Sequence, residues 1–259
     1  MDLSLKGKVA VVTGASKGIG FAIAKAFLTE GCSVGICARN EKELFTAKVA
    51  LETYGTVLAK RCDATCQREI EQFGQAVYDT FGKIDCWVAN VGGIGHRGED
   101  GYSEADIDEV TKLCFNSAVY GCQVAGSYMK RNPRGGSIIT ISSLAARCPT
   151  AGRRTLYGPL KAAVRHLAAT YAAEYAQWNI RVNSVLPGFT STEAVMKNVP
   201  EHERIQINER TLLGRMAKPE EIANPVVFLC SDAASYITAT SLEVSGGREV
   251  VLNPEIARL

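Results

Sequence analysis

The chain has 259 residues, with 29 Lys and Arg against 27 Asp and Glu and a formal net charge of +2. Hydrophobic residues make up 46% and charged residues 22%, proportions typical of a globular protein, which excludes intrinsic disorder. The balanced charge disfavours a nucleic-acid partner, and no apolar run approaches the roughly 18 residues of a membrane span, so we expect neither nucleic acid nor membrane as a partner.

Short apolar runs alternate along the chain with segments in which apolar residues recur at helical spacing. Strands are predicted at 9–13, 33–38, 57–62, 86–89, 137–142, 181–186 and 241–244, and helices at 18–30, 41–54, 67–81, 103–130, 157–178 and 219–230. This alternation predicts an α/β fold, a single Rossmann-type doubly wound parallel sheet of about seven strands with helices on both faces. No linker or change of composition divides the chain, so we expect one domain over residues 1–259.

A glycine-rich turn joins the first predicted strand to the first predicted helix. It contains Gly14, Ser16, Lys17, Gly18, Ile19 and Gly20. Glycines let the backbone approach a pyrophosphate closely, and a helix N-terminus offers unpaired N–H groups and a partial positive charge. A tight turn that needs small residues is the alternative interpretation, but the strand–turn–helix context favours a dinucleotide site.

The residues after the second predicted strand bear on which dinucleotide binds. NAD-binding sheets place an acidic residue here to hold the ribose 2′-hydroxyl. This chain instead has Arg39 there, and the first carboxylate after the predicted strand is that of Glu41. Arg39 and Lys17 can pair with a 2′-phosphate, although both would also be ordinary as solvated surface charges. The pattern favours NADP(H) over NAD(H).

A serine at the end of the fifth predicted strand precedes a tyrosine and a lysine spaced by four residues. Tyr157 and Lys161 lie one helical turn apart on one face. A nearby ammonium lowers the pKa of a phenol and suits it to general acid–base chemistry, and Ser143 can orient a carbonyl oxygen. A single Tyr-x-x-x-Lys match is also typical of an amphipathic helix, but the order of loop, serine and helix favours a catalytic set.

The glycine spacing and these three residues resemble the short-chain dehydrogenase/reductase family, and the resemblance extends from about residue 5 to residue 247. Other residues are similar to family positions that contact the adenine (Asp63 and Ala64), the adenine ribose (Asn90, Val91 and Gly92) and the nicotinamide carboxamide (Pro187, Gly188, Thr190 and Thr192). Asn116 is similar to the asparagine that completes the catalytic tetrad. Ala217 and Ala239 stand where the family usually has glycine.

The resemblance implies hydride transfer between the nicotinamide of NADP(H) and a carbonyl carbon or secondary alcohol. Tyr157 would protonate the nascent alkoxide, Lys161 would lower the pKa of Tyr157 and hold the nicotinamide ribose, and Ser143 would fix the substrate oxygen. Asn116 would hold a water that links Lys161 to solvent. The family also implies a substrate-binding loop at about 189–214 and assembly as a homotetramer or homodimer.

The overall resemblance is to 3-oxoacyl-carrier-protein reductases and similar ketoreductases, which implies a small carbonyl compound or alcohol as the substrate. Lys130, Arg131 and Arg134 form a basic cluster that could meet an acidic carrier protein, or could simply be a solvated helix end. Three arginines precede Tyr157: Arg147, Arg153 and Arg154. They could select an anionic substrate, or they could simply be exposed charges of a loop. His96 and Arg97 could also line the site.

Two alternatives of other kinds stay open from the sequence. One is an NAD-linked hydroxysteroid or sugar-alcohol dehydrogenase; the other is a non-catalytic cofactor sensor, which the intact Ser/Tyr/Lys set disfavours. Nine cysteines without a Cys-x-x-Cys pair and only three histidines predict structural thiols and no metal site. The N-terminus lacks the apolar region of a signal peptide, so we expect a cytoplasmic protein.

Overall fold

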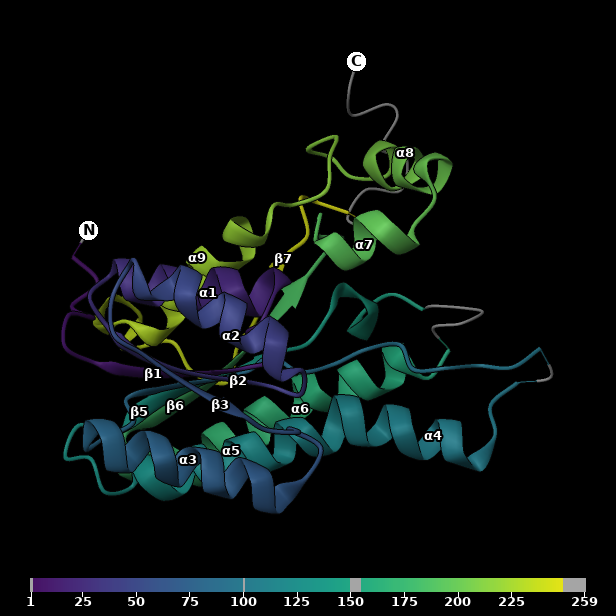
Figure 1. Ribbon diagram of the computed structural model, residues 1–259. Helices are drawn as coiled ribbons and strands as arrows, with labels where there is room; N and C mark the ends of the chain where they lie inside the picture. Colours follow the sequence, from purple (N-terminus) through teal and green to yellow (C-terminus); the bar gives the residue numbers. More distant parts are fainter. Residues whose placement is uncertain (1, 100, 150–154, 249–259) are drawn as a thin grey trace.

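A parallel β-sheet of seven strands forms the centre of the computed structural model, which describes residues 2–99, 101–149 and 155–248 (Figure 1). The strand order is β3-β2-β1-β4-β5-β6-β7, and every neighbouring pair is parallel. The strands are β1 (Val9–Thr13), β2 (Ser33–Ala38), β3 (Val57–Arg61), β4 (Cys86–Ala89), β5 (Gly136–Ile141), β6 (Ile180–Pro187) and β7 (Ser241–Val244). The predicted doubly wound sheet is confirmed.

Helices cover both faces of this sheet. One face carries α1 (Gly18–Thr29), α2 (Glu41–Glu52) and α9 (Pro219–Cys230), and the other carries α3 (Gln67–Phe81), α5 (Ser117–Met129) and α6 (Tyr157–Tyr175) (Figure 1). Alternate strand residues serve the two layers: Ala10 and Val12 join the core under α1 and α9, whereas Val9 and Val11 join the core under α3 and α5. Because both faces are covered, β1 is buried along its whole length, which explains its continuous apolar sequence.

The helix predicted over 103–130 is interrupted. The structure has α4 (Glu104–Thr111), a π-helical turn η1 (Lys112–Asn116) and then α5. The expected start is confirmed, since the Ser103 and Asp106 side chains bond each other's backbone N–H groups. A π-helical turn inserts one residue without changing the composition, so the apolar periodicity could not reveal it.

The stretch 189–214, expected as a substrate-binding loop, is partly helical. It contains two short helices, α7 (Glu193–Asn198) and α8 (Glu201–Glu209), which lie beyond the carboxyl ends of the strands (Figure 1). No residue of α7 is buried, and only Ile207 of α8 is. Helices with so few core residues carry no apolar stripe, which is why their spacing gave no signal.

Smaller differences concern helix ends and single turns. The helix predicted to end near residue 178 ends at Tyr175 and continues as a 3₁₀ turn, η4 (Ala176–Trp178). The described residues also form the 3₁₀ turns η2 (Leu144–Ala146) and η5 (Asp232–Ala234). Seven of the nine cysteines are buried, as expected for small apolar side chains. In the described part of the chain, no helix has the length and apolar character needed to cross a membrane.

Candidate active site

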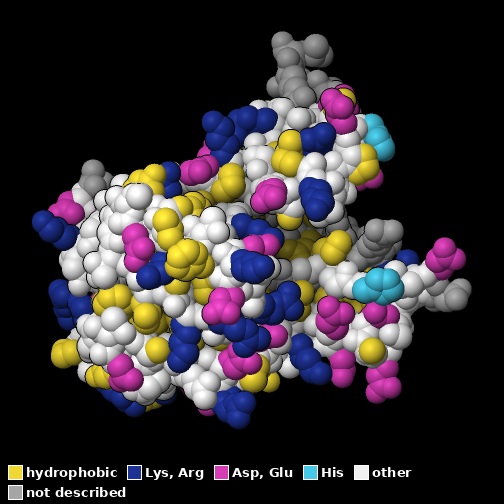
Figure 2. Space-filling view, viewed as in Figure 1, with side chains coloured by type: hydrophobic (Ala, Val, Ile, Leu, Met, Phe, Trp, Pro, Cys, Tyr) yellow, Lys and Arg dark blue, Asp and Glu magenta, His cyan; other side chains and the backbone are white. Residues whose placement is uncertain are grey.

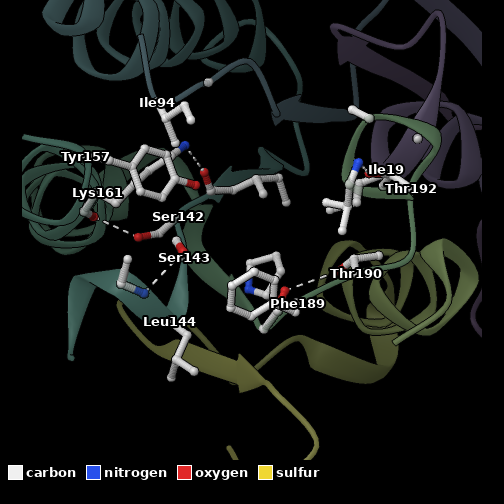
Figure 3. A pocket seen from close by; sticks show the side chains of 18 of the residues that line it. Ile19, Ile94, Ser142, Ser143, Leu144, Tyr157, Lys161, Phe189, Thr190 and Thr192 are labelled. Atoms are coloured by element: carbon white, nitrogen blue, oxygen red, sulfur yellow. Dashed lines mark hydrogen bonds between the residues drawn. The ribbon is translucent and has the colours of Figure 1, made fainter. Parts of the chain in front are cut away.

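A cavity of about 630 Å³ opens where β1, β4, β5 and β6 end. Thirteen of the residues predicted for the site line it: Lys17, Gly18, Ile19, Gly20, Asn90, Gly92, Ser143, Tyr157, Lys161, Pro187, Gly188, Thr190 and Thr192. Figure 3 shows Ser143, Tyr157 and Lys161 on one side of the cavity and Ile19, Thr190 and Thr192 on the opposite side. Segments far apart in sequence therefore meet around one space.

The glycine-rich loop has the conformation that its sequence predicts. Gly14 and Gly18 have positive φ of 65° and 60°, which favours glycine. A Cβ on Gly20 would contact the carbonyl oxygen of Gly14 and lie 2.7 Å from Nδ2 of Asn90, so no larger residue fits. Among the described residues, no side chain caps the N-terminus of α1. Its first N–H groups thus stay available for an anion at the cavity.

Asn90 ties this loop to the end of β4. Its Nδ2 donates hydrogen bonds to the carbonyl oxygens of Thr13 and Gly14, at 3.0 and 3.2 Å. Its backbone N–H donates to Oγ1 of Thr13 at 3.1 Å, and that hydroxyl donates to the carbonyl of Val88. The ends of β1 and β4 are therefore fixed to one another, which holds the floor of the site.

Arg39, predicted to pair with a 2′-phosphate, and Asp63, predicted to contact the adenine, lie outside the cavity lining at the ends of β2 and β3, whereas Lys17 lines the cavity. Arg39 is exposed between β2 and α2. Lys17 forms an ion pair with Glu43 at 3.1 Å. The Asp63 carboxylate accepts hydrogen bonds from the N–H and Oγ1 of Thr65, at 3.0 and 2.8 Å. Gly14, Ser16, Ala64 and Val91 also do not line the cavity.

Ser143, Tyr157 and Lys161 meet on the wall opposite the glycine-rich loop. Tyr157 is the first residue of α6, which leaves its phenol at the cavity, and Lys161 follows one turn later. Ser143 begins the 3₁₀ turn after β5, and its Oγ accepts a hydrogen bond from the N–H of Ala145 at 3.1 Å. The Lys161 Nζ lies 5.8 Å from the centroid of the Tyr157 ring.

Lys161 is held at both ends and is only 2% exposed. Its Nζ donates to the carbonyl of Ile141 at 2.8 Å, and its own carbonyl accepts a hydrogen bond from Oγ of Ser142 at 2.7 Å. A Cβ on Gly92 would lie 2.6 Å from this Nζ, so glycine leaves the space that the ammonium occupies. Burial lowers the pKa of the Lys161 ammonium below its usual value, and the neighbouring Cys114 opposes this shift.

Asn116 is not among the residues that line the cavity. It is the last residue of the π-helical turn η1, immediately before α5. In the same turn, Cys114 donates from Sγ to the carbonyl of Gly93 at 3.0 Å, which fixes η1 against the segment after β4. The wider turn thus lies behind Lys161 rather than beside the open space.

The segment after β6 closes the cavity on the side of the glycine-rich loop. Gly188 donates its N–H to the carbonyl of Val244 at 2.9 Å, and a Cβ there would lie 2.8 Å from Cα of Ser245. Thr190 is buried, and Thr192 caps α7 by accepting a hydrogen bond from the N–H of Val195 at 3.3 Å. A Cβ on Gly18 would lie 3.3 Å from Cγ2 of Thr192, so the two walls are in contact here.

Several basic residues expected near the substrate are engaged elsewhere. Arg147 pairs with Glu243 at 2.8 Å, and His96 pairs with Asp106 at 3.1 Å. The Arg97 guanidinium lies 5.6 Å from the centroid of the Tyr102 ring. None of Arg147, His96 and Arg97 lines the cavity. Arg153 and Arg154 lie outside the described residues.

The sequence analysis missed several residues of the cavity: Ile94, Ile141, Ser142, Leu144, Ala145, Cys148, Pro149, Phe189, Glu193, Ala194, Val195, Arg210 and Arg248. Phe189 directly follows the predicted Pro187–Gly188 pair, and Arg210 belongs to the expected loop at 189–214, so position alone could have suggested both. Arg248 is far in sequence from the predicted site segments, and tertiary folding brings it to the cavity. Within the described residues, no three His, Cys, Asp or Glu side chains gather where they could hold a metal ion.

The known proteins that this chain resembles are dehydrogenases and reductases. The family model described as Enoyl-(Acyl carrier protein) reductase matches residues 14–249. The 7alpha-hydroxysteroid dehydrogenase of Escherichia coli (strain K12) is 34% identical over 253 residues, covering 97% of this chain and 98% of that protein. Sorbose reductase sou1 of Schizosaccharomyces pombe is 36% identical over 249 residues, covering 94% of this chain and 96% of that protein.

A solved structure has the same architecture. It is a 7alpha-hydroxysteroid dehydrogenase complexed with NADH and 7-oxo glycochenodeoxycholic acid, with a TM-score of 0.91 and 34% identity, covering 97% of this chain and 98% of that one. The similarity covers nearly the whole of both chains, so the two proteins share one overall fold.

Proposed function

This chain belongs to the short-chain dehydrogenase/reductase family, and on that premise we propose that it uses NADP(H) to interconvert a carbonyl compound and a secondary alcohol, with Tyr157 as general acid and base. Oxidoreduction at a CH–OH group is the reaction class of the family. The observation that carries the assignment of roles is the placement of Ser143, Tyr157 and Lys161 on one wall of a cavity whose opposite wall begins with the glycine-rich loop.

The cavity fits a dinucleotide. The uncapped N-terminus of α1, in the glycine-rich part of the cavity lining, suits a pyrophosphate. Asp63 and Ala64 are assigned to the adenine, and Asn90, Val91 and Gly92 to its ribose. Pro187, Gly188, Thr190 and Thr192 are assigned to the nicotinamide. When bound, the cofactor would give or take the hydride. The side chains of the protein would transfer the proton and orient the substrate.

Each catalytic side chain has one task in this proposal. In reduction, the Tyr157 hydroxyl gives its proton to the developing alkoxide, and in oxidation the phenolate takes it back. A cation favours a phenolate near it, and the anchored Lys161 ammonium supplies that charge. Ser143 donates a hydrogen bond to the substrate oxygen. Asn116, the last residue of the π-helical turn η1, holds a water that links Lys161 to solvent.

The proposed preference for NADP(H) rests on charge. Arg39 is exposed at the end of β2, where a 2′-phosphate would lie, and no carboxylate occupies that position. Lys17 is close enough to help, but its pairing with Glu43 weakens its contribution. The similar structure solved with NADH keeps NAD(H) as the alternative that the cofactor experiment must exclude.

The walls of the cavity favour an apolar substrate over a polyol. Ile94, Leu144, Phe189 and Val195 are apolar residues of its lining. A sugar alcohol would need hydrogen-bond partners along its length, because buried hydroxyls without partners are costly. A cyclic or aryl ketone of the hydroxysteroid type therefore fits better than a sugar. An acyl chain on a carrier protein stays a prediction: Lys130 and Arg131 already contact the rings of Trp178 and Tyr128, at 4.0 and 5.2 Å.

A homotetramer or homodimer in the cytoplasm completes the proposal. Small side chains on the outer part of α6, among them Ala162, Ala169 and Ala173, are partly or fully exposed and would let a helix of a second copy approach closely. Light scattering on the purified protein tests the assembly. A monomeric mass would contradict it.

The experiment for the reaction is a panel of aryl ketones, steroid ketones, β-keto thioesters and ketoses, each followed by absorbance with NADPH and with NADH. We expect turnover of apolar ketones with NADPH and a lower kcat/KM with NADH. Tight NADPH binding without oxidation of any member would instead favour a cofactor sensor.

A further inference from the structure

Two arginines from distant parts of the sequence line the same cavity. Arg210 follows the last turn of α8, and Arg248 follows β7 and the Gly246–Gly247 pair. Gly246 and Gly247 have positive φ of 65° and 75°, which bends the chain after β7 toward α8. Neither arginine belongs to the catalytic wall or to the glycine-rich loop. Both line the cavity that the catalytic wall also lines.

The same two arginines mark the junction of the cavity with a second one of about 420 Å³. That second cavity shares Phe189, Arg210 and Arg248 with the first and is otherwise lined by His202, Glu203, Gln206 and Ile207 of α8. In Figure 2, hydrophobic side chains lie in the hollow beneath the α7–α8 segment. A substrate that reacts at Tyr157 and extends along the apolar wall would therefore reach the arginines with its distal end.

Arg248 is held in position by its surroundings. Its Nη1 donates to the carbonyl of Ile207 at 2.9 Å, and its guanidinium lies 5.1 Å from the centroid of the Phe189 ring. Arg210 is exposed, and its side chain makes no ion pair or hydrogen bond with any residue that the structure describes. An anchored guanidinium beside a second, available one is an arrangement that binds carboxylates or phosphates through several charge-assisted hydrogen bonds.

Two carboxylates lie near the two arginines, one in the lining of each cavity. Glu193 lines the first cavity and Glu203 the second. Within the first cavity, two guanidinium groups thus face one carboxylate. Two lysines also line the first cavity, but Lys17 lies in the glycine-rich loop and pairs with Glu43, and Lys161 lies on the catalytic wall. Arg147, expected from the sequence to select an anion, is bound to Glu243 instead.

We infer that the substrate carries an anionic group, a carboxylate or a phosphate, at the end opposite its reacting carbonyl, and that Arg210 and Arg248 bind it. The inference rests on the proposed function and narrows its substrate class to apolar ketones or secondary alcohols with an acidic end. Binding of the anionic end would position the ketone against Ser143 and Tyr157. The apolar residues of the cavity would contact the part of the substrate between its carbonyl and its anionic end.

Matched pairs of ketones that differ only in charge test this inference. Suitable probes are para-acetylbenzoate against para-acetylbenzamide and benzoylbutyrate against its primary amide, with the methyl phosphonate analogues as a second anion. For the wild type we expect a kcat/KM for the acids that exceeds that for the amides by about tenfold or more, because a hydrogen bond to a charged group is lost in the amide.

Arg210→Gln should abolish this preference by lowering kcat/KM for the acids and leaving that for the amides within about twofold. Arg210→Lys, which keeps the charge, should restore part of it. Lys197→Gln removes an exposed cation of α7 that lines neither cavity and should keep the wild-type preference. Binding of each probe to the NADPH complex, measured by calorimetry, should show the same order. Comparison of the two anions shows whether carboxylate or phosphonate is the better ligand.

The outcomes separate this inference from the proposed function. Turnover of acids and amides with equal kcat/KM, or a preference that persists in Arg210→Gln, would overturn the anion site and leave the reductase. Absence of turnover with every ketone would overturn the proposed function. The calorimetric arm then still decides: tighter binding of the acids that is lost in Arg210→Gln supports the anion site, and equal binding refutes it.

Discussion

The catalytic wall and the α7–α8 segment (residues 193–209) face each other across one cavity but are built in different ways. Lys161 is buried and bonded at its ammonium and at its carbonyl, and Asn90 ties two strand ends together. The α7–α8 segment, by contrast, has Ile207 as its one buried residue. The side chains proposed to move protons are thus fixed at the ends of the sheet, whereas Arg210, proposed to bind the far end of the substrate, follows a weakly packed helix.

Because of this difference, we expect substitutions in the two regions to have different effects. A change on the catalytic wall alters atoms with several bonded neighbours, so its effects are large and act on the chemical step. A change in the α7–α8 segment touches few neighbours, so it alters binding with little effect on global stability. Four substitutions, ordered by the size of the expected effect, test this division.

Tyr157→Phe should reduce turnover by about a thousandfold or more, since it removes the group proposed to carry the proton. NADPH affinity, measured by fluorescence titration, should change by no more than about threefold, because the ring stays in place. Tyr236→Phe, at a tyrosine fully exposed on the surface, is the matched control and should behave as the wild type. A Tyr157→Phe variant that keeps a tenth of the activity would refute the role.

Arg39→Asp should shift the ratio of kcat/KM for NADPH over NADH by about a hundredfold toward NADH. The aspartate removes a donor to the 2′-phosphate and adds an acceptor for the ribose 2′-hydroxyl. Lys42→Asp makes the same charge change on the exposed first turn of α2 and serves as the control. Equal ratios in the two variants would mean that only the overall charge matters and that Arg39 does not contact the phosphate.

The fold and the catalytic wall were predictable because their signals are local. A buried parallel strand is a continuous apolar run, such as the one that ends at Thr13, and a positive φ at Gly14 and Gly18 calls for glycine. The spacing of Tyr157 and Lys161 places both side chains on one helical face whatever surrounds them. These features follow from the backbone geometry of a few consecutive residues.

The substrate end was not predictable because it depends on contacts between distant segments. Arg147 was assigned to the substrate from its position before Tyr157, but the fold places Glu243 of β7 within 2.8 Å of it. Arg248 was not considered, although the turn after β7 carries it to Ile207 of α8. Which cation remains available for a ligand depends on tertiary pairing, and one sequence carries no record of that pairing.

Ile207→Ala should loosen the α7–α8 segment without unfolding the protein. Ile207 is 7% exposed and anchors α8, so its truncation costs about 2 kcal/mol of local stability. We expect faster hydrogen exchange over residues 193–209, a higher KM for ketones and an almost unchanged kcat. Ile70→Ala, in the core under α3, should instead lower Tm by several degrees. Equal losses of Tm in the two variants would contradict the idea that the α7–α8 segment is packed more weakly than the core.

Ala239→Gly should stabilise the protein by about 0.5 kcal/mol. Ala239 has a positive φ of 58°, where Ala is strained, and it stands where the family usually has glycine. The strain persists because the backbone is fixed there: the N–H of Ala239 donates to the carbonyl of Val182 at 2.8 Å, and Nδ2 of Asn183 donates to the carbonyl of Ile237 at 2.9 Å.

The control for this last substitution is Ala233→Gly, an exposed position in the 3₁₀ turn η5 without a positive φ. There glycine only adds freedom to the unfolded chain, so stability should fall by about 0.5 kcal/mol or more. Chemical denaturation of both variants gives the two signs. Opposite signs would place the strain at the edge of the rigid sheet, beside β7, since a loosely held loop would relax to a negative φ and gain nothing from glycine.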